Sequence, residues 1–281
     1  MRMLEQLSLA GQALWLTLRE WRAGRLWAPW LVLGMFQCAA LLALLGFAHP
    51  LLAWALAPFV RVIGGEPALH YPGFYRALPF LYSRVDLVVG SLVGAVATGW
   101  STRLFAARWR RERLTAGEAW AEVAPRVLTL VLAQLPFQLL VLLFSGLVDR
   151  ALVGHGGWVQ RLGYLATQGG VAGLQALFLY LPALVVIERR GLWRALAGLP
   201  RAWARGFWAA LLLGLAALLP LLPLAGLEQG SGLLVDRGTP ELVGWVTAMQ
   251  LLVGLAVSFL LAGSSTLVYL GAVADQPGEE G

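Results

Sequence analysis

The chain contains no lysine, a single cysteine and few charged residues of either sign. Only 13% of its 281 residues are charged, whereas 59% are hydrophobic. Soluble domains carry about twice that share of charged residues, so the composition excludes a water-soluble globular protein. Because Cys38 is the only cysteine, no disulfide can form within the chain.

The sequence also lacks the short motifs of common enzyme classes. It has no HExxH, CxxC, GxSxG or GxGxxG pattern and no P-loop, which mark zinc proteases, redox or zinc sites, hydrolases and nucleotide-binding folds. His70 and His155 have no second histidine or carboxylate at ligand spacing, so we interpret both as loop residues. The sequence therefore predicts no cofactor, no metal and no enzymatic activity.

What the chain does have is long apolar runs. A membrane-spanning helix needs roughly 20 mostly apolar residues, and only helices and closed barrels satisfy their own backbone groups in hydrocarbon. The runs do not alternate between polar and apolar residues, so we predict an all-α, polytopic helical bundle. Its six predicted spans are residues 26–48, 79–104, 127–148, 162–187, 207–227 and 242–273.

A seventh apolar run, residues 51–63, contains Pro58 and ends beside Arg61. It is too short to cross a bilayer. We interpret it as either an interfacial or a re-entrant segment.

The arginines lie unevenly on the two sides of the predicted bundle. If the N-terminus is cytoplasmic, fifteen of the 21 arginines fall on the cytoplasmic side and six outside. Cytoplasmic loops are enriched in basic residues, so both termini are predicted to be cytoplasmic. Because the arginines lie at span ends rather than on one basic face, we expect anionic lipid headgroups as partners and no nucleic acid.

Each predicted cytoplasmic segment carries apolar residues at helical spacing ahead of a span. The middle segment opens with Thr115 and Glu118, which form a capping box. This pattern predicts a threefold repeat of one interfacial helix followed by two spans. The three apolar stripes are Leu4, Leu7, Leu14 and Leu18; Leu114, Trp120, Val123 and Val127; and Leu192, Leu196, Leu199 and Trp203.

We therefore divide the chain into three parts. Residues 1–25 are an amphipathic interfacial helix, residues 26–274 a six-span membrane domain, and residues 275–281 a disordered acidic tail. Small residues at four-residue spacing, which let helices approach closely, indicate packing inside the bundle or a dimer seam. These pairs are Gly90 and Gly94, Gly169 and Gly173, and Gly254 and Ser258.

Polar side chains inside the spans need partners, either across the bundle or along a polar substrate path. The candidate polar or lipid contacts are Arg84, Asp86, Gln134, Gln138, Gln168, Gln175, Glu188 and Gln250, and Gln37 is a further polar residue in a span.

The charged candidates are predicted to lie near the ends of their spans. Arg84 and Asp86 belong to the outer end of span two and Glu188 to the inner end of span four, which leaves no carboxylate at mid-depth and argues against an ion-coupled transporter. Arg84 and Asp86 point about 200° apart on a helix. We expect one of them to face the bundle interior, bound to a loop residue or a lipid headgroup, and the other to reach water.

One stretch resembles a known family. Residues 183–212, ALVVIERRGLWRALAGLPRAWARGFWAALL, are similar to a segment in the membrane domain of glycerophosphodiester phosphodiesterases and in related bacterial six-span proteins, and residues 113–122, RLTAGEAWAE, are similar to an earlier loop of the same families. Ala202 replaces the serine often found before the second aromatic residue. The likeness is carried by Glu188, Gly191, Ala195, Leu196, Trp203 and Phe207.

The resemblance implies a bacterial inner-membrane domain with six spans, interfacial helices and no assigned chemistry. The phosphodiesterase activity of the family belongs to a separate soluble barrel, which we do not expect in this chain. Our leading hypothesis is a non-enzymatic membrane protein that acts through lipids, a protein partner or self-association, as a scaffold or accessory subunit of a transport or envelope complex. The alternatives are a transporter or lipid-handling permease without its own energy source, and a membrane enzyme that uses Arg84, Asp86, His70 or Glu188.

Overall fold

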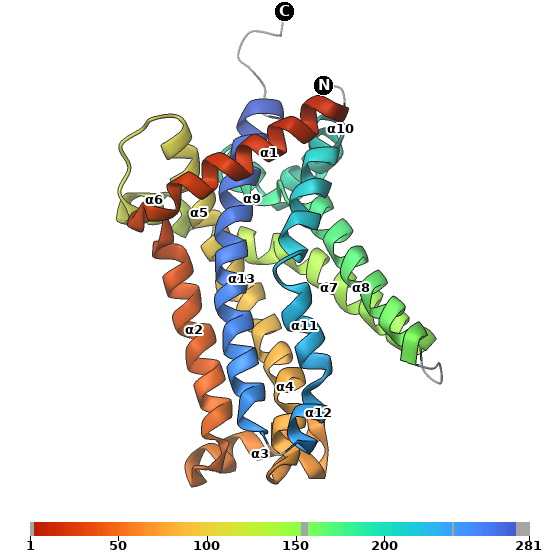
Figure 1. The fold of residues 1–281 in the computed structure, drawn as a ribbon. Helices are drawn as coiled ribbons and strands as arrows, with labels where there is room; N and C mark the ends of the chain where they lie inside the picture. The colour runs from red at the N-terminus through yellow and green to blue at the C-terminus, as the bar shows by residue number, and fades with distance from the viewer. Residues whose placement is uncertain (1–2, 153–156, 238, 274–281) are drawn as a thin grey trace, which may run out of the picture. The chain divides into compact units, whose positions relative to one another are not determined.

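The chain folds into helices joined by short turns (Figure 1). The computed structural model describes residues 3–152, 157–237 and 239–273, and these residues contain no strand; the predicted acidic tail lies outside them. Within them, five helical stretches are long and apolar enough to cross a membrane, which makes the chain an all-α, multi-pass membrane protein. The five stretches are Gly24–Ala48, Gly73–Trp109, Ala116–Leu152, Leu165–Val186 and Glu241–Val273.

The chain divides into two compact units. Unit 1 comprises Met1–Pro29, Ala95–Leu218 and Ser258–Gly281, and unit 2 comprises Trp30–Gly94 and Leu219–Val257. The helices of unit 1 are α1 (Met3–Arg19), η1 (Glu20–Arg22), η2 (Gly24–Trp27), α5 (Ala95–Trp109), α6 (Ala116–Val123), η6 (Ala124–Arg126), α7 (Val127–Leu152), α8 (Gly157–Phe178), α9 (Leu181–Val186), α10 (Leu192–Leu218) and η7 (Tyr269–Val273). Those of unit 2 are η3 (Gly46–Ala48), α3 (Pro50–Gly64), η4 (Glu66–Leu69), α4 (Gly73–Val89), η5 (Gly90–Gly94), α11 (Leu222–Gln229) and α12 (Ser231–Asp236), while α2 (Ala28–Leu45) and α13 (Glu241–Val268) have residues in both units.

Five of the six predicted spans correspond to one of the five apolar stretches. The exception is span five, residues 207–227, which is divided between α10 and α11. Pro220 lies in the turn between these helices; it has no backbone N–H, and its ring clashes with the carbonyl four residues earlier. The short run at residues 51–63 forms α3, a helix of 15 residues with Pro58 inside it.

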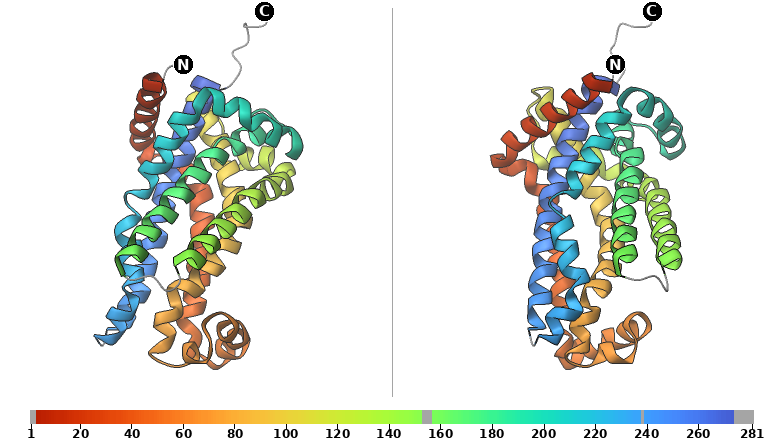
Figure 2. Two further views of the ribbon diagram at one scale, coloured as in Figure 1. Left: turned by 90° about the vertical axis from the view of Figure 1, so that its right-hand side faces the viewer. Right: turned by 45° about the vertical axis from the view of Figure 1, so that its right-hand side comes forward.

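The interfacial helix predicted from the stripe of Leu192, Leu196 and Leu199 is continuous with the beginning of span five, and the two form one helix, α10. Pro200 lies inside α10, and the teal first half of the helix turns away from its cyan second half (Figure 2). A proline removes one hydrogen bond from the helical ladder, which accounts for a bend without a break.

The N-terminal helix α1 packs on the rest of unit 1 through small and polar residues and not through its leucines. Its buried residues are Gln6, Ala10, Ala13 and Thr17, whereas Leu4 is 77% exposed. In a soluble protein the leucine stripe would face the core. A membrane protein has apolar surroundings, so its helices meet through small residues and their large apolar side chains can point outward.

Unit 1 is held together by such small residues. The face of α10 that contacts α1 and α8 is rich in glycine and alanine. A Cβ atom added to Gly206 would lie 2.7 Å from the Tyr180 hydroxyl oxygen, and one on Gly214 would lie 3.0 Å from the Ala172 carbonyl oxygen. These two glycines therefore permit contacts that a larger residue would block.

Helices α7 and α8 form an antiparallel hairpin in unit 1 (Figure 2). Two of the contacts that fix its register are at glycines, since an added Cβ would lie 2.2 Å from Leu152 at Gly163 and 2.2 Å from Phe144 at Gly170. Further along the hairpin, the rings of Phe137 and Phe178 have centroids 5.8 Å apart.

The glycines of the predicted small-residue pairs have open space beside them among the residues that the structure describes. A Cβ atom added to Gly90, Gly169, Gly173 or Gly254 would have no heavy atom within 4 Å, and one on Gly94 would meet only Leu33, at 3.9 Å. Glycines that do pack closely are eight residues apart on α10 (Gly198, Gly206 and Gly214) and seven apart on α8 (Gly163 and Gly170), so the four-residue pattern was a poor guide to them.

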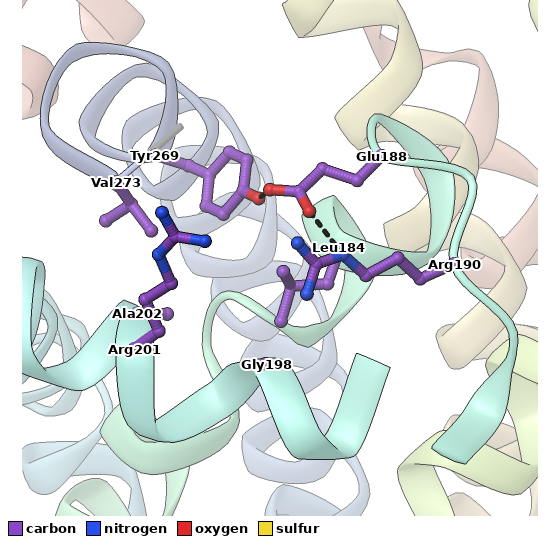
Figure 3. Close-up of a pocket in the computed structure, with 8 residues that line it drawn as sticks. All are labelled: Leu184, Glu188, Arg190, Gly198, Arg201, Ala202, Tyr269 and Val273. Atoms are coloured by element: carbon purple, nitrogen blue, oxygen red, sulfur yellow. Dashed lines mark hydrogen bonds and ion pairs between the residues drawn. The ribbon is translucent and has the colours of Figure 1, made fainter. Parts of the chain in front are cut away.

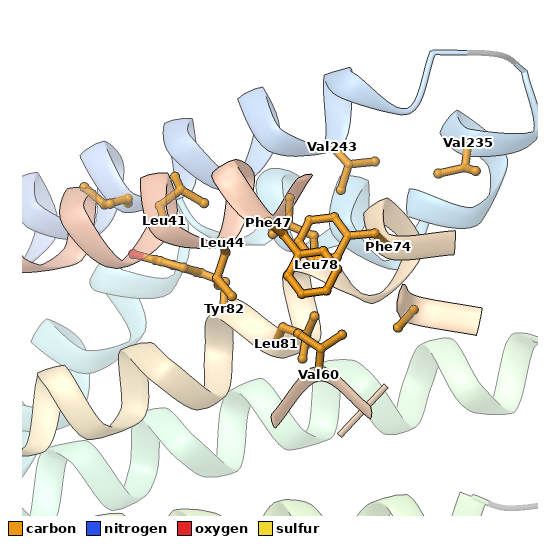
Figure 4. Packing of buried hydrophobic residues seen from close by; sticks show 12 residues of the cluster. Leu41, Leu44, Phe47, Val60, Phe74, Leu78, Leu81, Tyr82, Val235 and Val243 are labelled. Atoms are coloured by element: carbon orange, nitrogen blue, oxygen red, sulfur yellow. The ribbon is translucent and has the colours of Figure 1, made fainter. Parts of the chain in front are cut away.

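Unit 2 has a core of large side chains from several of its helices (Figure 4). The rings of Phe47 and Phe74 are stacked with centroids 5.1 Å apart, and Tyr82 points from α4 toward α2 beside Leu41. The other labelled core residues are Leu44, Val60, Leu78, Leu81, Val235 and Val243.

Candidate functional site

A group of exposed charges in unit 1 lies where η1 and η2 meet the end of α5. The two segments are joined by an ion pair between Arg108 Nη2 and Glu20 Oε1, 2.9 Å apart. Around this pair lie six exposed arginines whose side chains make no hydrogen bond or ion pair with any described residue, and we call them the arginine surface. They are Arg19, Arg22, Arg25, Arg110, Arg111 and Arg113.

A left-handed residue, Arg111, ends the helical turn that follows α5 beside the arginine surface. Arg111 has a φ of 59°, and its N–H donates to the Arg108 carbonyl at 3.2 Å while the N–H of Glu112 donates to the Ala107 carbonyl at 2.8 Å. This is a Schellman ending, in which glycine is the usual residue at the left-handed position. An arginine in this left-handed conformation is less favourable than a glycine by about 1 kcal/mol.

Tryptophans support the same end of unit 1. Trp21 and Trp27 meet edge to face at 4.7 Å, and Trp27 stacks on Phe259 at 4.4 Å. Trp27 donates its ring N–H to the Trp21 carbonyl at 2.8 Å, and Trp109 donates to the Gly263 carbonyl at 3.4 Å. Tryptophan beside arginine is typical of the headgroup level of a bilayer.

Another arginine of the same helix has a structural role. Arg103 has a 15% exposed side chain and binds Glu122 through its Nε at 2.8 Å and Glu112 through its Nη1 at 3.0 Å. It ties α5 to α6, whose capping box is confirmed: the Thr115 N–H donates to Glu118 Oε2 at 2.7 Å, and the Glu118 N–H donates to Thr115 Oγ1 at 3.2 Å.

Glu188, a candidate from the sequence, lies just after α9 in a network of polar side chains (Figure 3). It accepts a hydrogen bond from the Tyr269 hydroxyl and pairs with Arg190 Nε at 2.5 Å. Gly198 makes room for this arrangement, because an added Cβ would lie 2.7 Å from Arg190 Nη1. Arg201 borders the same small cavity of about 10 Å³, which is roughly the space of one water molecule. We interpret this cluster as a structural contact that holds the α9–α10 loop against η7.

Asp86 and Arg84 on α4 have separate surroundings, as the helix geometry predicts. Arg84 is exposed and stacks on the ring of Phe80 in its own helix, 4.7 Å from the ring centroid. Asp86 is partly buried, and its Oδ1 accepts a hydrogen bond from Gln37 Nε2 at 2.6 Å. Its partner within the protein is thus a residue of another helix and not a loop residue.

The position of Asp86 along the helices also differs from the prediction. Gln37 is the tenth of the 18 residues of α2, so the carboxylate bound to it lies level with the centre of that helix. Charged residues are therefore not confined to the ends of the spans, and a carboxylate at this level is compatible with ion coupling. The sequence does carry a signal for Gln37, because it is the only polar side chain between Trp30 and Leu45 apart from Cys38.

The structure does not bring the remaining glutamines together in one polar path. Gln134 and Gln138 lie on α7 and Gln168 and Gln175 on α8, and none of these four side chains makes a hydrogen bond within the described residues. In the register of the hairpin, Gln138 and Gln175 lie at about the same level, whereas Gln134 and Gln168 lie at different levels. Gln250 lies on α13 in unit 2, and its Oε1 is buried with no hydrogen-bond partner.

The histidines offer no metal site in the part of the chain that the structure describes. His49 lies at the start of α3 and His70 after η4, and His155 lies outside the described residues. No described group of three histidine, cysteine or acidic residues could hold a metal ion.

Comparison with known proteins finds no family model, curated protein or solved structure that matches the chain. The resemblance to the membrane domain of glycerophosphodiester phosphodiesterases therefore stays a prediction.

Proposed function

We propose that this multi-pass protein is a non-enzymatic component of a bacterial inner membrane. It acts through anionic lipids or a protein partner, as a scaffold or accessory subunit of a transport or envelope complex. The observation that supports this most is the arginine surface, with six exposed guanidinium groups that make no ion pair among the described residues. A basic residue near an anionic membrane surface contributes about 1 kcal/mol, so the six together favour a strongly bound layer of anionic headgroups.

In this proposal the arginine surface is cytoplasmic, the second half of α10 and α11 complete a sixth span, and both termini are cytoplasmic. The excess of arginines on that side supports this orientation. Topology reporters fused after Arg113 and at the C-terminus should report the cytoplasm, and reporters fused after Gly156 and after Arg237 should report the outside. A cytoplasmic signal from Gly156 would contradict this topology.

Lipid binding can be tested by removing charge from the arginine surface. The triple variant Arg110→Gln, Arg111→Gln, Arg113→Gln should lower the affinity for phosphatidylglycerol or cardiolipin by about a hundredfold, at about 1 kcal/mol per arginine. The measurement is the amount of lipid retained after purification in mild detergent, by mass spectrometry. Higher salt should weaken the retention further, because it screens exposed charges.

A matched control removes the same charge elsewhere. Arg84→Gln, Arg150→Gln, Arg237→Gln together change three exposed arginines outside the arginine surface and should leave lipid retention unchanged. Equal lipid loss from both triple variants would contradict a specific surface. If lipid is retained by both but a co-purifying protein is lost only from the first, the surface contacts a partner rather than lipid.

A second candidate function is a transporter or lipid-handling permease without its own energy source. The observation that favours it is Asp86, a carboxylate level with the centre of α2 that is bound by a neutral amide. In membrane proteins such residues often belong to ion or substrate pathways. Under this alternative Asp86→Asn would abolish cellular function while the triple variant of the arginine surface would not.

A further inference from the structure

Three polar side chains of unit 2 lie at one level of its helices. Besides the bond between Gln37 and Asp86, two contacts fix α2 and α13 in an antiparallel register: an added Cβ on Gly34 would lie 2.8 Å from Leu255 Cδ1, and one on Gly244 would lie 3.1 Å from Leu45 Cδ2. In this register Gln250 lies within one helical turn of the level of Gln37.

The hydrogen-bonding capacity of this group is unbalanced. Gln37 Oε1 and Gln250 Oε1 are buried and have no hydrogen-bond partner among the described residues, and Asp86 adds a carboxylate that accepts one bond from Gln37. All three groups offer oxygen atoms, and a single N–H is donated to the carboxylate. A buried carbonyl oxygen without a donor costs about 1 to 3 kcal/mol, so the group favours a ligand that carries positive charge or donates hydrogen bonds.

Among the residues that the structure describes, no charged side chain of the neighbouring elements neutralises Asp86. On α4 itself, Arg84 is stacked on Phe80, while Arg76 pairs with Asp236 of α12 and lies ten residues earlier, about 15 Å along the helix axis.

The other packed elements offer no counter-ion either. Arg61 of α3 pairs with Glu66 of η4, α2 contributes only the exposed thiol of Cys38, and the ionisable residue of α13 is Glu241 at its first position. Tyr75 and Tyr82 are the remaining titratable side chains of α4. An ionised carboxylate held by one neutral amide in an apolar interior is costly, which favours neutralisation by a bound cation.

We propose that Asp86, with the amide oxygens of Gln37 and Gln250, is a binding site for a small monovalent cation, either a proton on the carboxyl group or a sodium ion. Gln37 can serve both states of the site. Its N–H donates to the ionised carboxylate, and after rotation of the amide its oxygen accepts from a protonated carboxyl group. A sodium ion would instead be bound by the carboxylate and the two amide oxygens, since hard cations prefer oxygen ligands. The site lies in unit 2 and does not depend on lipid binding by the arginine surface.

The test uses the full-length protein in detergent and dicyclohexylcarbodiimide, an apolar reagent that modifies carboxyl groups carrying a proton. Asp86 should be modified at about pH 7, at which exposed carboxylates are ionised, whereas the exposed Asp236 and Glu66 should not be. Peptide mass spectrometry locates the modified residue in the wild-type chain, so the test does not require a variant to fold. Asp86→Asn should remove the modification and Gln37→Leu should extend it to higher pH, because the ionised carboxylate loses its hydrogen-bond donor.

Two arms of the experiment separate the two cations. If sodium binds, sodium chloride should reduce the modification of Asp86 about tenfold relative to choline chloride, because the ion competes with the proton for the carboxylate. If the site takes a proton only, the two salts should give the same result, and raising the pH should reduce the modification. An unmodified Asp86, or one modified no more than Asp236, would overturn the proposal, and neither result would bear on lipid retention.

Discussion

The two units of this protein differ in how their buried polar groups are paired. In unit 1 the inward-facing charges of Arg103 and Glu188 have ionic partners, and the unpaired arginines are exposed. In unit 2 a carboxylate is bound by one amide, and the amide oxygens of Gln37 and Gln250 are buried without a donor. The difference indicates that unit 1 presents charge outward to a surface, whereas unit 2 keeps a polar group inside for a ligand.

The units also differ in how their helices pack. Helix contacts of unit 1 depend on glycine and alanine, as on α10, and its helix ends are tied by side-chain hydrogen bonds such as the capping box of α6. Unit 2 fills its interior with leucine and phenylalanine. We therefore expect unit 1 to be sensitive to atoms added between its helices, and more sensitive than unit 2 to lost ionic partners.

The largest effect is expected from adding one methyl group to α13. A Cβ atom on Gly263 would lie 2.3 Å from Thr17 Cγ2 and 2.8 Å from Phe105 Cε1, and both neighbours are fully buried. Gly263→Ala should therefore destabilise unit 1 by about 1 to 3 kcal/mol, measured as a lower unfolding temperature in detergent.

The control lies on the same helix but in unit 2. An added Cβ on Gly254 would have no atom within 4 Å, so Gly254→Ala should be neutral or stabilise by up to about 1 kcal/mol through helix propensity. Equal unfolding temperatures of the Gly263→Ala and Gly254→Ala variants would contradict the expected difference in packing between these two sites.

A smaller effect is expected from the ion pairs. Arg103→Gln leaves Glu112 without an ionic partner and Glu122 with only the longer pair to Arg189, at 3.8 Å. The arginine side chain is only 15% exposed, so the loss should be about 1 to 2 kcal/mol. In unit 2, Arg61 pairs with Glu66 with both side chains at least 60% exposed, and Arg61→Gln should cost under about 1 kcal/mol. Thermal unfolding of both variants checks the ranking, and a larger loss from Arg61→Gln would reverse it.

The smallest effect concerns helix beginnings. Thr115→Ala removes the side-chain acceptor that caps α6 and should cost about 1 kcal/mol. Helix α3 of unit 2 begins at Pro50, and the residue before it, His49, makes no side-chain cap, so His49→Ala should change stability by less than about 0.5 kcal/mol. Hydrogen exchange at the first turn of each helix is the direct measurement. Unchanged exchange in Thr115→Ala would show that tertiary contacts, not the cap, hold α6.

Two features of the structure have a local signal in the sequence, whereas the long-range contacts of the candidate sites have none. Pro220 marks the interruption of the predicted fifth span, and its effect on a helix is local. Gln37 was visible as a polar residue in an apolar run, but its bond to Asp86, 49 positions away, has no local signal. The network of Glu188 with Tyr269 likewise joins residues 81 positions apart.

The sequence alone determined the properties that depend on neighbouring residues. The length and apolarity of a run decide whether a helix can cross a bilayer, and five predicted spans correspond to the five apolar stretches. The capping box at Thr115 is confirmed for the same reason, since its two partners are three residues apart. Only the tertiary structure decided which face of each helix packs, which glycines allow close contact, and that Asp86 is bound at the level of the centre of α2. In a membrane both the protein interior and the lipid are apolar, so hydrophobic periodicity does not distinguish the packed face of a helix from its outer face, and long-range pairing decides instead.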